Sequence, residues 1–157
     1  MNFNKVRIIT LLVIIFAVGC KKNLTESSEK FFLEKLNQNV QNEDAGSMLS
    51  FTDFKFDIEN DSLIIECREH KKFEDRVVCQ LVSKVNMKDL NDLSMDGKHS
   101  LHFKTNPKSV ITREKCSDID KEIIEHETDL WVEFDIPPEQ NLLHELRNAL
   151  KDLKKGI

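Results

Sequence analysis

The sequence predicts an α+β protein: an N-terminal helix, six or seven antiparallel strands in a meander that curls into a roll or partial barrel, and a C-terminal amphipathic helix. Three observations lead to this prediction. Apolar residues recur every fourth position near residue 30, alternate with polar residues in several stretches between residues 51 and 136, and return to helical spacing after residue 140. The chain has 157 residues, 39% hydrophobic and 32% charged, which suits one domain with its own core. Consecutive antiparallel strands beside terminal helices are typical of this fold class.

The first 19 residues have the three parts of a secretory signal peptide. Residues 1–7 carry two positive charges and no acid, residues 8–18 are apolar apart from Thr10, and the small residue Gly19 precedes Cys20. A helix over residues 8–18 would rise about 16 Å, whereas the hydrocarbon core of a bilayer is about 30 Å thick. This segment is therefore too short to span and is expected to be removed. The alternative is a signal anchor that stays attached.

The sequence Ala17-Val18-Gly19-Cys20 resembles the lipobox of bacterial lipoproteins, with Ala17 where that family most often has Leu. The resemblance implies cleavage between Gly19 and Cys20, a diacylglyceryl thioether on Cys20, and acylation of the new amine with a chain such as palmitate. It also implies the outer membrane rather than the inner one, because residue 21 is Lys and not Asp. Residues 20–28 would form a lipidated tether, and residues 29–157 one domain. The alternative is a plain signal peptide that ends at a cysteine.

The charge balance bears on the class of partner. The net charge is −5, and loss of residues 1–19 removes Lys5 and Arg7 but no acid, which makes it −7. An acidic protein repels the phosphates of nucleic acids, and charge alone does not attract it to anionic lipid. We therefore expect no nucleic-acid partner, and contact with the membrane through the N-terminal lipid.

The N-terminal helix is predicted over Ser28–Val40, because apolar residues stand at positions 32, 36 and 40 and Ser27 or Ser28 can cap it. Residues 41–47 have the composition of a loop. The period then changes to two over residues 53–59, and Asn60-Asp61 is a plausible two-residue turn. This hairpin would place three apolar pairs on one face: Ile58 opposite Leu63, Phe56 opposite Ile65, and Phe54 opposite Cys67.

Further strands follow at residues 76–85, around a hairpin at Asp96-Gly97, at residues 109–113 and at residues 130–136. Residues 115–129 are acidic and irregular, with at most a helical turn at residues 119–124. After Pro137-Pro138, which can start a helix, an apolar stripe at helical spacing predicts the C-terminal helix. That stripe consists of Leu142, Leu143, Leu146, Ala149, Leu150 and Leu153.

An amphipathic last strand followed by a leucine-striped helix loosely resembles the end of the pleckstrin-homology-like roll, whose C-terminal helix plugs one end. The similarity covers residues 51–154 and rests on the order of elements. It therefore implies a fold and no activity.

The cysteines predict one disulfide. If lipid occupies Cys20, an odd number remains, namely Cys67, Cys79 and Cys116. A loop symmetric about residue 73 would set Cys67 opposite Cys79, where a close antiparallel pair allows a bond in an oxidising compartment. Cys116 would then be free. The alternative is three buried thiols.

Candidate chemistry is sparse. Asp118 and Asp120 start like a calcium loop but lack its later Gly and Glu, so a solvated acidic loop is the better interpretation. His99 and His102 would point to opposite faces of a strand, which makes a poor chelate. His126, among acids, reads as a surface residue. No metal, cofactor or catalytic motif is predicted.

Trp131 is the single tryptophan. It could be an exposed recognition residue, because its neighbours in the strand take the inner face. We expect instead that a second layer, such as the N-terminal helix, covers it.

Two functions remain open. The first is a lipid-anchored, non-catalytic envelope protein that binds a protein, peptide or glycan partner, for example by strand addition at an exposed sheet edge. The second is an envelope hydrolase or metal-dependent enzyme that uses Cys116, His126, Asp118 and Asp120. The first is the preferred prediction.

Overall fold

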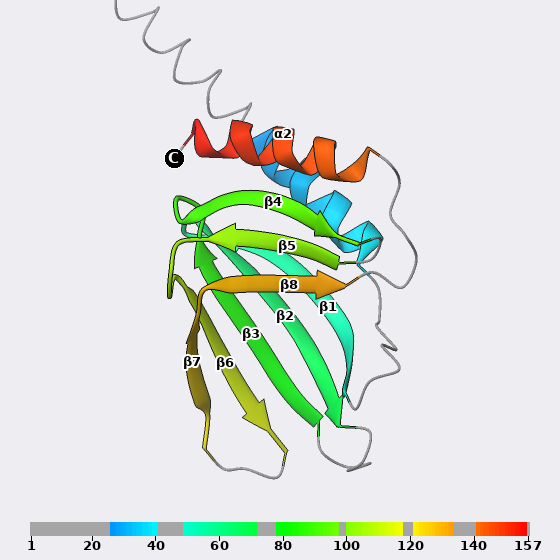
Figure 1. The fold of residues 1–157 in the computed structure, drawn as a ribbon, viewed down its shortest axis with the longest axis vertical. Helices are drawn as coiled ribbons and strands as arrows, with labels where there is room; N and C mark the ends of the chain where they lie inside the picture. Colours follow the sequence, from blue (N-terminus) through cyan, green and yellow to red (C-terminus); the bar gives the residue numbers. More distant parts are fainter. Residues whose placement is uncertain are drawn as a thin grey trace, which may run out of the picture.

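The computed structural model describes residues 26–40, 49–71, 78–97, 100–117, 121–133 and 141–156. The signal peptide, Cys20 and its cleavage site, His99, Asp118 and Asp120 lie outside these residues. Within the described residues the fold is α+β, with two helices and two antiparallel sheets of five and three strands that do not close into a barrel (Figure 1). The helices are residues 26–39 and α2 (Leu142–Lys154). The strands are β1 (Leu49–Glu59), β2 (Ser62–Lys71), β3 (Val78–Asn86), β4 (Leu90–Asp96), β5 (Ser100–Thr105), β6 (Val110–Cys116), β7 (Ile123–Glu127) and β8 (Asp129–Glu133).

The N-terminal helix is confirmed, with Phe32, Leu36 and Val40 all buried. It already includes residues 26–28, which the sequence had placed in the tether. The C-terminal helix is also confirmed. Its stripe is buried at five positions, while Leu143 packs at the margin of the core.

The first hairpin forms as predicted near its turn. Ile58 lies opposite Leu63 and Phe56 opposite Ile65. Asn60 and Asp61 both have positive φ, at 48° and 56°, which is the backbone of the type I′ turn that matches the twist of paired strands. Phe54 and Cys67 are not a regular pair, because the register shifts between Thr52 and Lys55, where Asp53 and Phe54 together lie opposite Cys67.

The strands do not form one meander. The five-stranded sheet has the order β1-β2-β3-β6-β7, and the three-stranded sheet has the order β4-β5-β8. The hairpin of β4 and β5 therefore leaves the first sheet after β3, and the chain returns to it with β6. Gly97, at φ 65°, lies in the turn predicted at Asp96-Gly97.

The prediction for residues 115–129 was wrong in part, because residues 123–127 are a strand. Two adjacent isoleucines in an otherwise charged stretch match neither a clean alternation nor a helical period. Pairing with β6, from Val110↔Glu127 to Glu114↔Ile123, selects the extended form.

The disulfide prediction was also wrong. Cys79 is bonded to Cys116, and Cys67 is a free thiol. The loop between β2 and β3 is not symmetric about residue 73, so Cys79 lies opposite Glu69 and Cys67 lies opposite Leu81. On the other side of β3, Cys79 and Cys116 are directly opposed.

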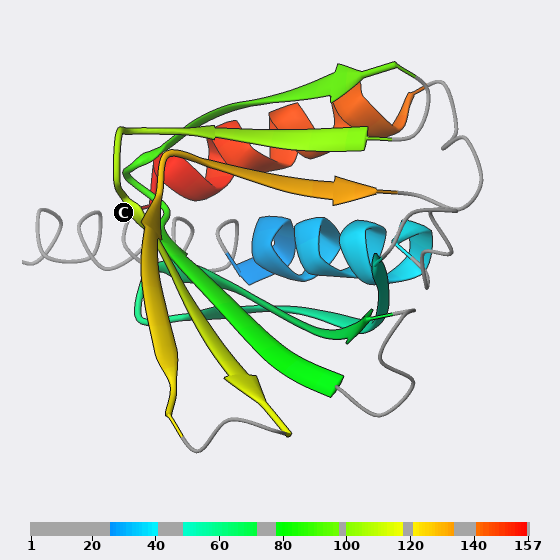
Figure 2. The same cartoon turned by 60° about the horizontal axis from the view of Figure 1, so that its bottom comes forward.

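A single core joins the helices to both sheets. Figures 1 and 2 show the two helices side by side, next to β4 and β1 and away from the free tips of β6 and β7. Lys35 of the N-terminal helix forms an ion pair of 2.8 Å with Glu145 of α2.

The helices also cover two sheet edges with polar side chains. The amide of Asn37 bonds both the backbone N–H (3.1 Å) and the C=O (3.2 Å) of Phe56, as a neighbouring strand would. From α2, Arg147 donates to the carbonyl of Leu93 at 2.8 Å, and Lys154 donates to that of Leu90 at 2.8 Å. The outer edges of β1 and β4 therefore have partners for part of their backbone.

Candidate binding surface

The two sheets end on consecutive strands. β7 is the last strand of the five-stranded sheet and β8 the last strand of the three-stranded sheet, and only Thr128 lies between them. Within the part of the chain that the structure describes, no element pairs with the outer edge of β7. Such an edge presents unpaired N–H and C=O groups to which another extended chain can bond.

Exposed apolar side chains are most frequent on β7 and its neighbour β6. Among the described residues, five large hydrophobic side chains are exposed. Three belong to β6 and β7, a fourth to β8, and the fifth to the N-terminal helix; they are Ile111, Ile123, Ile124, Trp131 and Phe31. Single exposed apolar residues are ordinary, but a group of them beside an unpaired edge indicates an interaction site.

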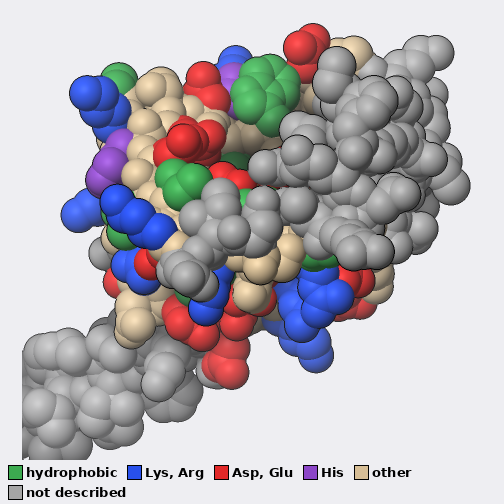
Figure 3. Space-filling model, turned by 90° about the horizontal axis from the view of Figure 1, so that it is seen from below, with side chains coloured by type: hydrophobic (Ala, Val, Ile, Leu, Met, Phe, Trp, Pro, Cys, Tyr) green, Lys and Arg blue, Asp and Glu red, His purple; other side chains and the backbone are tan. Residues whose placement is uncertain are grey.

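The segment that contains β7 is acidic as well as apolar. Residues 121–129 contain four carboxylates and one lysine. Glu125 and Glu127 share the face of β7 that lies toward the core side of the sheet, because Glu127 is opposite the buried Val110 and Glu125 is opposite the buried Thr112. Ile124 and His126 point to the other face. Viewed from below, charged side chains of both signs are interspersed with a few hydrophobic ones over the described surface (Figure 3).

A chain of hydrogen bonds fixes β7 to the sheet. The hydroxyls of Ser83 and Thr112 are 2.9 Å apart, and Thr112 donates to the Glu127 carboxylate at 2.5 Å. These three residues belong to β3, β6 and β7. These hydrogen bonds therefore fix the register of β7 on β6.

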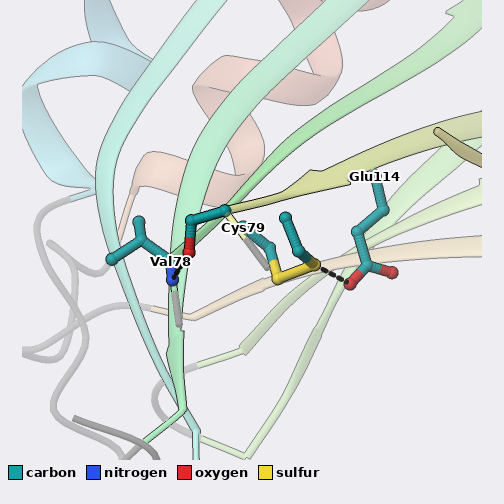
Figure 4. The surroundings of a disulfide bond; sticks show 5 residues. Val78, Cys79 and Glu114 are labelled. Atoms are coloured by element: carbon teal, nitrogen blue, oxygen red, sulfur yellow. Dashed lines mark hydrogen bonds between the residues drawn. A yellow bond between two sulfur atoms is a disulfide. The ribbon is translucent and has the colours of Figure 1, made fainter. Parts of the chain in front are cut away.

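The disulfide ties together the other end of β3 and β6 (Figure 4). Next to it, Ser117 donates its backbone N–H to Val78 O (3.1 Å) and accepts the N–H of Val78 on its hydroxyl (3.3 Å). Since β7 follows β6 in the chain and pairs with it, this clamp also stiffens the support of the open edge.

The disulfide also removes a candidate metal site. The ligand atoms of Cys79, Glu114 and Cys116 lie within 4.8 Å of one another. Metals bind the thiolate form of cysteine, and in this structure the two sulfurs are bonded to each other. Burial, with a smaller contribution from Glu69, raises the pKa of Cys67 to about 12, which favours its thiol form over the thiolate that binds metals.

Trp131 is 48% exposed, so the expectation that a second layer covers it was wrong. One face of its indole stacks on the His102 ring, with centroids 3.8 Å apart and planes 2° apart. His102 Nε2 is 3.2 Å from a carboxylate oxygen of Asp129, and Nδ1 is 3.5 Å from the Ser94 hydroxyl. The sheet itself aligns this group, because Ser94, His102 and Trp131 are cross-strand neighbours.

The residues named for an enzyme are not brought together where the structure describes them. Cys116 is buried in the disulfide at the end of β6, whereas His126 is exposed and pairs with Ile111. Ile111 and Cys116 are five positions apart on β6, about 17 Å along an antiparallel strand. Two hollows that described residues line lie elsewhere, one between the helices near Phe31 and Ala149 and one on β1 and β2 near Phe54 and Cys67.

The open edge itself was missed, because β7 was not predicted. The signal that could have indicated it is the pair of β-branched residues Ile123-Ile124 in a stretch without glycine or proline.

No family model and no curated protein matches this sequence, and no solved structure matches this fold. The similarity to pleckstrin-homology-like rolls therefore stays a prediction. None of the helices in the described residues is both long and apolar enough to cross a membrane.

Proposed function

We propose that this is a non-catalytic, lipid-anchored protein of the bacterial cell envelope, which holds a protein partner at the membrane surface by strand addition along β7. The observation that carries the proposal is the open edge of β7, with Ile123 and Ile124 exposed beside it. Backbone hydrogen bonds along such an edge supply affinity for an extended segment, and alternate side chains supply selectivity.

The location rests on the N-terminal sequence and is compatible with the disulfide. A bond between Cys79 and Cys116 fits an oxidising compartment, which a secretory signal would provide. Lipid on Cys20 would lie six residues before the helix at residue 26. Six extended residues reach about 20 Å at most, so the domain would stay close to the bilayer, with the outer membrane as the expected one.

The anchor is tested by fractionation of cells that express the wild type or Cys20→Ser. The wild type should sediment with membranes and the variant should be released in soluble form, because two or more acyl chains are needed for stable attachment. A Cys67→Ser variant is the matched control and should stay with the membranes. If Cys20→Ser also stays there, either the lipid anchor is wrong or the signal peptide is uncleaved, and the mass of the variant tells the two apart.

The docking site is tested by site-specific cross-linking in intact envelopes. A photo-reactive amino acid at residue 125, on the open edge, should give a covalent adduct with a partner. The same amino acid at residue 59, at the exposed end of β1, serves as the control and should not. Adducts of equal yield at both positions would show that β7 is not the docking site.

A further inference from the structure

We propose that the partner segment which adds to β7 is basic, with the pattern basic-x-basic-apolar-apolar when it runs antiparallel to β7. This inference rests on the proposed function and names the chemistry of the segment that the open edge takes. It follows from the order of side chains along β7 and from the charge around it.

The positions of the basic residues follow from the pleat. Glu125 and Glu127 lie two residues apart on one face of β7. An added strand places one residue opposite each of them, also two apart and on the same face, because side chains alternate with a period of two. Opposite charges in directly opposed pairs stabilise a sheet, and like charges destabilise it.

The positions of the apolar residues follow from the other half of the strand. Ile123 and Ile124 are adjacent, so they point to opposite faces, and both are exposed. The residues opposite them would cover one isoleucine on each face. Ile111 of β6 adds to the outer face, where it is the direct neighbour of His126.

A second copy of this chain is the alternative occupant, and the charges disfavour it. Residues 121–129 carry four carboxylates and one lysine, so pairing of two β7 edges would bring two acidic segments together. When that pairing is centred on residue 125, the two Glu125 carboxylates face each other. A basic segment neutralises the same carboxylates and is also attracted toward them before contact.

The test uses the domain that starts at residue 21 and a nine-residue peptide with blocked ends, with Lys-Thr-Lys-Val-Val at its centre. The matched peptide has Glu in place of each Lys. At low salt the Lys peptide should bind about tenfold more tightly than the Glu peptide, since two cross-strand pairs change from attractive to repulsive. The difference should shrink in about 1 M salt, where the Debye length falls to about 3 Å.

Charge reversal then locates the site. Glu125→Lys should invert the preference, so that the Glu peptide binds more tightly. Glu59→Lys, the same change of charge on β1, should leave the preference unaltered. Glu125 is exposed and forms no part of the hydrogen-bond chain through Glu127, so the variant should fold, and far-ultraviolet circular dichroism verifies this.

The outcomes separate the two proposals. If both peptides bind equally and methylation of alternate peptide nitrogens abolishes binding, strand addition stands and the basic pattern is overturned. If neither peptide binds and the cross-link at residue 125 is also absent, the proposed function fails together with the inference. If sedimentation shows a dimer that Ile124→Lys dissociates, the second copy is the occupant and the inference is overturned.

Discussion

The outer edges of β1 and β4 differ from the outer edge of β7 in whether helix side chains bond to their backbone. At β1 and β4, side chains from the helices bond to the backbone: Asn37 pairs with Phe56, and Arg147 and Lys154 donate to carbonyls of β4. At β7, the described residues place no such group, and the exposed side chains are Ile123, Ile124, Glu125 and His126.

The difference indicates that the backbone of β1 and β4 is protected from pairing with another chain, whereas the backbone of β7 is available for it. Unpaired edges promote aggregation, and proteins cover them, shorten them or place charges on them. The edges of β1 and β4 are covered over part of their length, and the edge of β7 is short and charged. Only the second solution leaves the backbone accessible, and its charges then select which segment can bind.

The covered edge depends most on the burial of the helix that supplies Asn37. Phe32→Ala should lower the free energy of unfolding by about 3–5 kcal/mol, because it empties a fully buried site in the core. Phe31→Ala is the matched control on the same helix. Its side chain is 40% exposed, and the change should stay within about 0.5 kcal/mol. Urea denaturation measures the free energy of unfolding of both variants. If Phe32→Ala loses as little as Phe31→Ala, the helix lies outside the cooperative unit.

The support of the open edge depends on the disulfide. Replacing Cys79 and Cys116 together by Ser should cost about 2–4 kcal/mol, since the bond closes a loop of sequence separation 37. Amide exchange should accelerate more in β6 and β7 than in β4 and β5. Cys67→Ser, which breaks no bond, should affect neither exchange pattern. Uniform acceleration in both sheets would contradict the assignment of the clamp to one edge.

The polar side chains that bond to the backbone of β1 and β4 should contribute less to the free energy of unfolding than the disulfide does. Asn37→Ala and Arg147→Ala should each cost about 1–2 kcal/mol, because each leaves backbone or carboxylate groups without their present partner. Asn39→Ala is the control, since the amide of Asn39 bonds within its own helix, to Lys35. Thermal unfolding measures the three variants, and the role of these side chains is refuted if Asn39→Ala is as costly as Asn37→Ala.

The open edge itself should contribute least to stability. Ile124→Lys should change the free energy of unfolding by less than about 0.5 kcal/mol, because the side chain is 53% exposed. It should nevertheless abolish binding of the partner. Ile65→Ala, at a buried position of β2, should cost about 2–5 kcal/mol in the same assay. A large loss of stability in Ile124→Lys would mean that the edge is structural.

The single tryptophan offers a further comparison on β8. Its indole is covered on one face by His102. His102→Ala should expose that face and shift the fluorescence emission to longer wavelength, with little change in the first sheet. An unchanged spectrum would contradict the stacked arrangement.

The sequence by itself determined the elements with a clear period. Residues 32, 36 and 40, the alternation around Phe56 and the leucine stripe of α2 each specify a buried face through local spacing. The turn at Asn60-Asp61 fixed the nearest cross-strand pairs for the same reason, because it acts over two residues. The candidate site was only partly predictable: strand addition at an exposed edge was expected, but β7 was not identified as that edge.

Tertiary structure decided the pairings that cross longer distances. The register of β2 on β3 sets Cys67 opposite Leu81 and not opposite Cys79, and the register of β3 on β6 sets Cys79 opposite Cys116, to which it is bonded. Residues 123–127 form a strand because they pair with the edge of β6. A shift in register reassigns every cross-strand partner without changing the local pattern of residues, so spacing along the chain specifies faces, and packing alone specifies which edges are covered and which stay open.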